Sequence, residues 1–219
     1  MFQIQSKLNE QNCLLGVLIM VSVDNLSNCR LLQNKKDSIE NGIRAKYDSV
    51  SRKALKEIYP LDVYSTYYKK FGYTYHVLPQ VESIVRGKSI PSINPLVEAM
   101  FMVELKNMLL TAGHDLEKVE PPLSLEISSG ENSYTGMNGK DINTVEDDFM
   151  VKDNQSVISS ILRGPDRRTC ITEGTSQVLF TVYAPEGIKE NTVYNHLDDI
   201  ESYVRIFSPK ADTRMKKVI

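Results

Sequence analysis

Hydrophobic residues near the start of the chain follow two patterns that are typical of β-strands. Residues 2–5 alternate between apolar and polar, which predicts an edge strand, and residues 14–21 are almost continuously apolar, which predicts a buried central strand. The apolar run ends at Val23 and has about half of the ~20 residues that a membrane-spanning helix needs. Lys7 is the lone basic residue before it, which disfavours a signal peptide. We therefore expect no membrane partner.

Helical spacing follows in the next part of the chain. Residues 28–55 combine dense charge with apolar positions at near-helical intervals, which predicts one or two amphipathic helices whose lysines face water. A helix over residues 62–70 should end at Gly72. Pro79 should open another helix, which should end at Gly87.

The clearest helix start is the pair Asn94-Pro95. Asn is a favoured N-cap residue, and Pro suits the first helical position because its missing N–H would have no partner there. The residues that follow, up to Leu105, form a wide apolar face. Apolar residues at helical spacing predict a last helix over residues 191–207.

The stretch between these helices has the character of β-structure. Residues 123–127, 157–162 and 178–183 have strand patterns, with glycine turns between the first two. The pattern predicts an α+β fold in one domain over residues 1–219. Its parts are an N-terminal α/β part over about residues 1–120, a β-rich part over about 121–185 and the C-terminal helix. Residues 210–219 are expected to fray.

Composition limits the partners and the compartment. The 219 residues include 26 basic and 28 acidic side chains, a net charge of -2, so no protein-wide field attracts phosphate and any nucleic acid contact must be local. We expect no DNA partner. The three cysteines are widely spaced and odd in number, which predicts free thiols and a cytoplasmic location. The oligomeric state stays open.

The common signatures of enzymes are absent from the sequence. His76, His114 and His196 lie far apart and have no Cys or acidic partner at metal-ligand spacing, so we expect no metal site. The sequence also lacks a nucleophile elbow, a P-loop and a dinucleotide-binding fingerprint, and we expect no cofactor.

Two local features suggest chemistry, and each has a simpler structural explanation. His114-Asp115 could be an acid–base pair, but an Asp in front of residues 116–119 is more often a turn or helix cap. The turn Arg163-Gly-Pro-Asp-Arg-Arg168 could hold a phosphate or carboxylate between guanidinium groups. It could equally be an exposed hairpin loop whose charges are solvated.

The order of several motifs resembles the B3/B4 domain, the editing domain of the phenylalanyl-tRNA synthetase β subunit. Residues 92–98 and 115–119 resemble the family's helix start and its D-L-D-K-L element, and residues 157–175 resemble a strand turn followed by V-T-E-E-T. The N-terminal half is similar to the free-standing branch of the family. The resemblance implies an α+β fold, with a helical N-terminal half packed on a mostly antiparallel β section. In the synthetase, the activity of the family is hydrolysis of the ester that wrongly joins tyrosine to phenylalanine tRNA.

Three residues depart from the editing pocket of that family. Ala112 stands where the family has a His, Ser160 replaces a Gly, and Thr181 replaces a Glu. The resemblance instead implies a different polar set around the pocket. It comprises His114 and Ser160 as catalytic candidates and Asn94, Asp115, Arg163, Asp166, Arg167 and Thr172 as ligand-binding candidates.

These residues predict an RNA-associated protein that binds tRNA or aminoacyl-tRNA and could deacylate it in trans. Asn94 and Ser160 would then position the ester and a water, His114 would assist proton transfer, and Arg163 with Arg167 would hold phosphate. The alternative is a non-catalytic module for a small anionic metabolite or an amino acid, which the balanced charge favours. A partner-binding domain with an empty pocket is the third possibility.

Overall fold

The computed structural model describes residues 3–8, 13–26 and 29–219. Phe2, at the start of the predicted edge strand, and Asn28, at the start of the predicted helical stretch, lie outside the described residues. In chain order the elements are β1 (Ile4–Ser6), β2 (Cys13–Val21), α1 (Arg30–Tyr47), α2 (Arg52–Leu55), α3 (Leu61–Lys70), α4 (Val77–Val85), α5 (Pro95–Asn107), β3 (Thr111–Asp115), the short 3-10 helix η1 (Leu116–Lys118), β4 (Leu123–Ile127), β5 (Ser133–Thr135), β6 (Asp141–Asn143), β7 (Phe149–Lys152), β8 (Val157–Ser160), β9 (Gly164–Pro165), β10 (Val178–Pro185), α6 (Glu190–Phe207) and β11 (Asp212–Val218).

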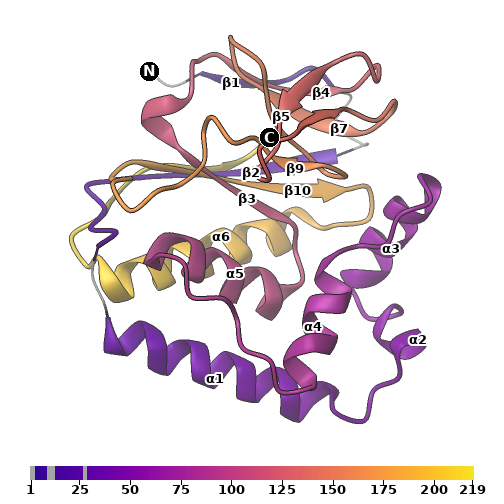
Figure 1. Ribbon diagram of the computed structural model, residues 1–219, viewed down its shortest axis with the longest axis vertical. Coiled ribbons are helices and arrows are strands. Elements are labelled where there is room, and N and C mark those ends of the chain that lie inside the picture. Colours follow the sequence, from indigo (N-terminus) through magenta and orange to yellow (C-terminus); the bar gives the residue numbers. More distant parts are fainter. Residues whose placement is uncertain (1–2, 9–12, 27–28) are drawn as a thin grey trace.

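The strands form two sheets, and the helices cover one side of the second sheet. One sheet has the order β1-β4-β7-β8-β9, the other has the order β11-β2-β10-β3, and β5 and β6 form a separate hairpin. Among the strand pairs of the described residues, β1 and β4 run parallel and the others are antiparallel. Figure 1 shows the five-stranded sheet above the four-stranded one, α5 and α6 below them, and α1 outermost. The fold is α+β with a mostly antiparallel β section, as the sequence predicts.

The core is continuous from the helices into the region between the sheets. Apolar residues of β2, β10, α5 and α6 form one buried cluster with those of β4 and β8. β2 is buried along most of its length, which confirms the predicted central strand. At Gly16 an added Cβ would lie 2.5 Å from Val193 Cγ1, so the glycine allows α6 to lie close to this strand.

Most helix boundaries agree with the predicted ones. The Asn94 side chain accepts a hydrogen bond from the backbone N–H of Val97 and caps α5, with Pro95 as the first helical residue. α4 begins at Val77, slightly ahead of Pro79. The predicted last helix corresponds to α6.

One lysine of the predicted water-facing set is buried. Lys36 on α1 is 3% exposed, and its Nζ donates to Ser92 Oγ at 2.6 Å and to Glu98 Oε2 at 3.1 Å. The prediction that the lysines of this stretch face water is therefore wrong for Lys36. A partner carboxylate more than sixty residues away makes the burial possible, and local spacing cannot reveal it.

The C-terminal segment does not fray. β11 pairs with β2 from Asp212 to Val218, and Ile219 exchanges two backbone hydrogen bonds with Leu15. Lys216 adds ion pairs to Asp198 and Glu201 on α6. The prediction of fraying is wrong because long-range ladder bonds, rather than apolar periodicity, hold this strand in place.

Candidate functional site

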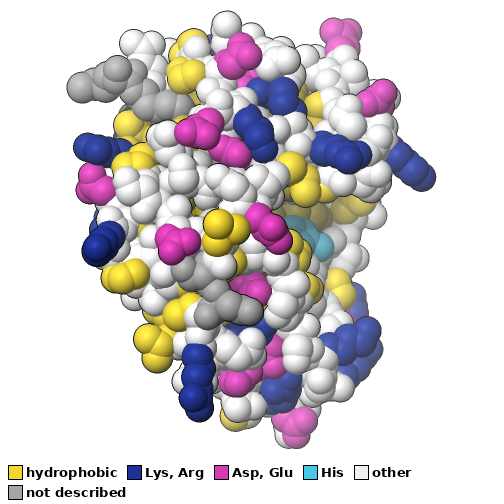
Figure 2. Space-filling view, turned by 60° about the vertical axis from the view of Figure 1, so that its left-hand side comes forward, with side chains coloured by type: hydrophobic (Ala, Val, Ile, Leu, Met, Phe, Trp, Pro, Cys, Tyr) yellow, Lys and Arg dark blue, Asp and Glu magenta, His cyan; other side chains and the backbone are white. Residues whose placement is uncertain are grey.

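A cavity of about 450 Å³ lies between α5, the edge strand β3 and the turn that follows β8. A hollow with a histidine and hydrophobic side chains around it is visible in the space-filling view (Figure 2). The lining residues are His76, Gln80, Ile93, Val97, Met100, Phe101, Glu104, Leu110, Thr111, Ala112, Gly113, Met137, Ser160, Ile161, Leu162, Arg163, Gly164, Pro165, Cys170, Ile171 and Tyr183.

The walls of the cavity are mostly apolar. Met100 and Phe101 project from α5, while Ile161, Leu162 and Ile171 come from the segments around β9. A cavity of this size, with apolar walls and a few polar groups, is the usual form of a small-molecule site.

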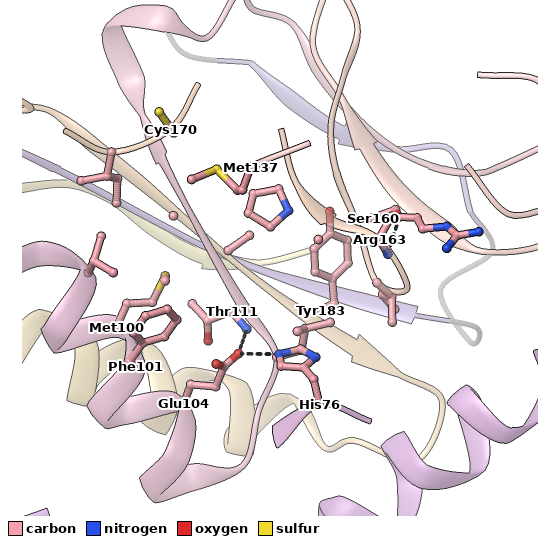
Figure 3. Close-up of a pocket in the computed structure, with 18 of the residues that line it drawn as sticks. His76, Met100, Phe101, Glu104, Thr111, Met137, Ser160, Arg163, Cys170 and Tyr183 are labelled. Carbon is pink, nitrogen blue, oxygen red and sulfur yellow. Dashed lines mark hydrogen bonds and ion pairs between the residues drawn. The ribbon is translucent and has the colours of Figure 1, made fainter. Parts of the chain in front are cut away.

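Glu104 is the acidic group at the bottom of the cavity. Its side chain is 2% exposed, and its Oε1 accepts a hydrogen bond from the Thr111 backbone N–H at 3.0 Å. The imidazole Nε2 of His76 lies 3.9 Å from the same oxygen (Figure 3). α5 places this carboxylate on the helix face that meets β3, between the buried residues Val103 and Leu105. The arrangement puts a negative charge beside the apolar walls.

A buried chain of hydrogen bonds ends at the cavity. The Thr169 hydroxyl donates to Asp166, and Thr169 Oγ1 lies 2.8 Å from His114 Nδ1. His114 Nε2 lies 3.5 Å from Ser159 Oγ, which is 2.6 Å from the Tyr183 hydroxyl. The Tyr183 hydroxyl also donates to the Ser159 backbone carbonyl at 3.0 Å. Because Tyr183 lines the cavity, the chain fixes the orientation of one wall.

The charge of His114 follows from its burial. Burial lowers the pKa of His114 to about 3, with Arg168 acting in the same direction, so the imidazole is neutral near pH 7. Because the Thr169 hydroxyl proton points to Asp166, His114 Nδ1 must carry the hydrogen that Thr169 accepts. This geometry suits His114 for positioning rather than for proton transfer.

Ser160 lies at the cavity and is held on two sides. Its Oγ accepts the backbone N–H of Arg163 at 3.2 Å, and its hydroxyl is hydrogen-bonded to the buried carboxylate of Asp148. Asp148 also accepts from the Tyr67 hydroxyl at 2.7 Å and from the backbone N–H of Leu162 at 3.0 Å. Burial raises the pKa of Asp148, and these hydrogen bonds oppose the shift. The serine oxygen is therefore held by the Arg163 N–H, and its hydroxyl lies beside two acceptors, Asp148 and Tyr134.

The comparisons with known proteins place this cavity within a known domain. A family model described as B3/4 domain matches residues 74–203, which is more than half of the chain and includes every residue that lines the cavity. The chain belongs to the B3/4 domain family. No curated protein sequence matches it.

The fold is similar to that of a solved structure of a synthetase fragment. That structure is an N-terminal fragment of the phenylalanyl-tRNA synthetase β subunit from Pyrococcus horikoshii, with a TM-score of 0.53 and 9% sequence identity. The similarity covers 97% of this chain and 50% of the other, so the B3/4 protein spans about half the length of that fragment. The resemblance seen in the sequence is confirmed at the level of family and fold.

Two of the predicted site residues line the cavity of this B3/4 domain. Ser160 and Arg163 are both in its wall. The guanidinium of Arg163 lies over the ring of Tyr73, 5.3 Å from its centroid. His114 and Asp166 belong to the buried hydrogen-bond chain behind the wall.

The other predicted residues have structural partners elsewhere. Asp115 caps η1 and accepts a hydrogen bond from Thr175 at 2.9 Å, and the Thr172 backbone N–H donates to the same Thr175 hydroxyl. Asn94 caps α5 beside a neighbouring hollow. Arg167 donates its backbone N–H to the Thr135 carbonyl.

The arginines of the Arg163–Arg168 turn do not act as one group. Arg168 pairs with Asp153 at 2.8 Å and lies 3.6 Å from Asp166, so its charge is used inside the protein. Of the three arginines, Arg163 is the one that lines the cavity. The turn is therefore neither a three-arginine clamp nor a simple solvated loop.

Sequence reasoning missed Glu104, His76 and Tyr183 as site residues. Glu104 did carry a signal, because it is a carboxylate in the wide apolar face of a predicted helix. Such a charge is costly to bury unless it serves a partner or a ligand. Tyr183 gave no signal, since an aromatic residue at the end of an apolar strand is typical of any core.

The part of the chain that the structure describes provides no candidate for a resident metal. Within residues 3–8, 13–26 and 29–219, His, Cys, Asp and Glu side chains do not gather in groups of three or more with metal-binding geometry. Cys13, Cys29 and Cys170 are free thiols. In the same part of the chain, every helix is too short or too polar to span a membrane.

Proposed function

We propose that this B3/4 domain binds the aminoacylated 3′ end of a tRNA and hydrolyses the aminoacyl ester in trans. The observation that carries the proposal is the cavity itself, whose apolar walls enclose one carboxylate and lead to a rim with a single arginine. Family membership and the fold shared with a synthetase fragment support the same conclusion.

The cavity offers a place for each part of an aminoacyl ester. The amino-acid side chain fits against Met100 and Phe101, and the ester lies next to Ser160. Arg163 at the rim supplies a charged donor for the phosphate of the terminal nucleotide.

Hydrolysis needs a water held against the ester carbonyl. Water adds to that carbon, the bond to the ribose oxygen breaks, and the proton of the water leaves with the ribose hydroxyl. Ser160, whose Oγ accepts the Arg163 N–H and whose hydroxyl lies beside Asp148, is suited to accept a hydrogen bond from that water and so to hold it. Positioning alone can supply a large part of the rate enhancement.

The proposal is tested by following ester loss from charged tRNAs. Phenylalanine tRNA charged with tyrosine, and tRNAs charged with noncognate alanine or serine, are incubated with the protein and with buffer alone. We expect faster loss from one pair, and a decrease of roughly 100-fold in the Ser160→Ala variant, the scale on which misplacement of a reacting group slows catalysis. The Arg163→Ala variant should bind the tRNA more weakly at an unchanged maximal rate.

Arg214→Ala is the matched control for the arginine. This residue is exposed on β11 and pairs with Asp212 at 3.3 Å, away from the residues that line the cavity. Ester loss equal to the buffer rate for every pair would contradict the hydrolytic function.

A second candidate is a non-catalytic module that binds a free amino acid or a small anionic metabolite. The internal pairing of Arg168 and the net charge of -2 favour it over extensive contact with RNA. Binding of a free ligand, together with no retention of tRNA on a filter and no ester loss, would support this candidate.

A further inference from the structure

We propose that Glu104 binds the cationic nitrogen of the ligand, so that the cavity selects compounds with an α-ammonium group beside an apolar side chain. The inference rests on the proposed binding of an aminoacyl group, and it names the residue and the charge that decide which ligands enter.

The first support is the free oxygen of Glu104. Oε1 accepts the Thr111 N–H, whereas Oε2 accepts no hydrogen bond from any of the described residues. Glu104 lines the cavity although its side chain is 2% exposed. This oxygen can be reached from the cavity, and an ammonium group there would supply up to three donors to it.

The second support comes from the other buried acidic groups. Glu40 is also buried, and it accepts the Ile90 backbone N–H at 2.8 Å while pairing with Arg44 at 2.9 Å. Asp153 pairs with Arg168 at 2.8 Å. For Glu104 the nearest cationic partner in the described chain is His76, at 3.9 Å and with a side chain 45% exposed. Glu104 thus has the backbone donor that Glu40 has, but it lacks the close counter-charge.

The third support is the polarity of the opposite wall. Arg163 carries the charge opposite to that of Glu104, and its guanidinium lies over the ring of Tyr73 at the rim. Figure 3 shows Glu104 and the Arg163 guanidinium on different sides of the cavity. An ammonium group therefore belongs at the Glu104 end, and an anion belongs at the rim.

The test compares ligands that differ only in the ammonium group. Methyl esters of leucine, methionine, phenylalanine and tyrosine are titrated calorimetrically into the full chain, each beside its deamino counterpart, such as methyl 3-phenylpropionate. We expect at least one amino ester to bind about 10- to 100-fold more tightly than its counterpart, the range of a hydrogen bond to a charged group. Equal affinities, or no binding of any amino ester, would overturn the proposal.

Glu104→Gln is the deciding variant, and Glu40→Gln is its matched control. The amide oxygen that replaces the Glu104 carboxylate can still accept the Thr111 N–H, so the local structure is retained, and a thermal melt checks this. The preference for amino esters should disappear in Glu104→Gln and persist in Glu40→Gln. Persistence of the preference in both variants would overturn the role of Glu104.

The outcome separates this inference from the proposed function. If Glu104 governs the ammonium preference but charged tRNAs are not hydrolysed, the binding role stands and the hydrolytic function fails. If charged tRNAs are hydrolysed at the same rate by wild type and Glu104→Gln, the hydrolytic function stands and the role of Glu104 fails.

Discussion

Gly113 on β3 keeps the cavity open because it has no side chain. An added Cβ would lie 2.7 Å from Ile171 Cδ1 and 3.1 Å from Met100 Sδ, and both of these side chains line the cavity. In Gly113→Ala the flexible ends of Ile171 and Met100 must move, and the adjacent space is the cavity. We expect the variant to fold and to bind the largest amino ester roughly 10-fold more weakly, on the scale of an overpacked site, as measured by calorimetric titration.

Gly16→Ala is the control for this steric effect. Its Cβ would collide with Val193 Cγ1 at 2.5 Å, in the core between β2 and α6. This change should lower the free energy of unfolding by about 1–3 kcal/mol without altering relative ligand affinities. If Gly113→Ala binds every ester with the wild-type affinity, Gly113 does not border the space that the ligand occupies.

Single residues also show where sequence reasoning works at this site and where it stops. Ser160 and Arg163 were found because they belong to a local strand-turn motif that can be read from neighbouring letters. Glu104 and Tyr183 come from α5 and β10, and the fold alone brings them together. Asn94 was expected both to cap a helix and to contact a ligand; the cap hydrogen bond is present, whereas Asn94 is not among the residues that line the cavity.

At the scale of elements, β11 closes the edge of the four-stranded sheet. Deleting residues 212–219 removes the ladder to β2 and the bonds of Lys216 to α6. Each ladder hydrogen bond contributes about 1 kcal/mol, so we expect the free energy of unfolding, measured in urea, to fall by at least roughly 3 kcal/mol. Lys216→Ala, which removes only half-exposed ion pairs, should cost about 1 kcal/mol or less. Equal stability of the truncated and full chains would mean that β11 is dispensable.

The helices and strands differ in how well the sequence alone predicts them. The helices and β2 were predictable because apolar periodicity and caps are local signals. β11 was not, because its sequence has little apolar alternation and its stability depends on a partner strand almost two hundred residues away. The burial of Lys36 has the same origin, since Glu98 lies on another helix.

At the scale of the whole molecule, the balance of charge limits how the protein can hold RNA. Lys and Arg side chains alternate with Asp and Glu over the face that contains the hollow (Figure 2), and several cations are already paired, as Arg168 is with Asp153. The α+β class and the family could be inferred from the order of the motifs. Which lysines and arginines are paired, and which are free to contact RNA, could not be inferred, because ion pairs depend on contacts in space.

The charge balance leads to a prediction about salt. If Arg163 and one or two further cations contact the single-stranded 3′ end, the slope of log affinity against log salt should be about -0.7 per phosphate. Raising salt from 50 to 200 mM should then weaken tRNA binding only roughly 10-fold, as measured by filter retention. Arg163→Ala should make the slope shallower by about 0.7, the share of one phosphate, whereas Arg214→Ala should leave it unchanged. A loss of roughly 1000-fold over the same range would require about seven phosphate contacts or more at this slope. Such a loss would show that tRNA binds to a basic surface away from the cavity, because the cavity rim supplies one arginine.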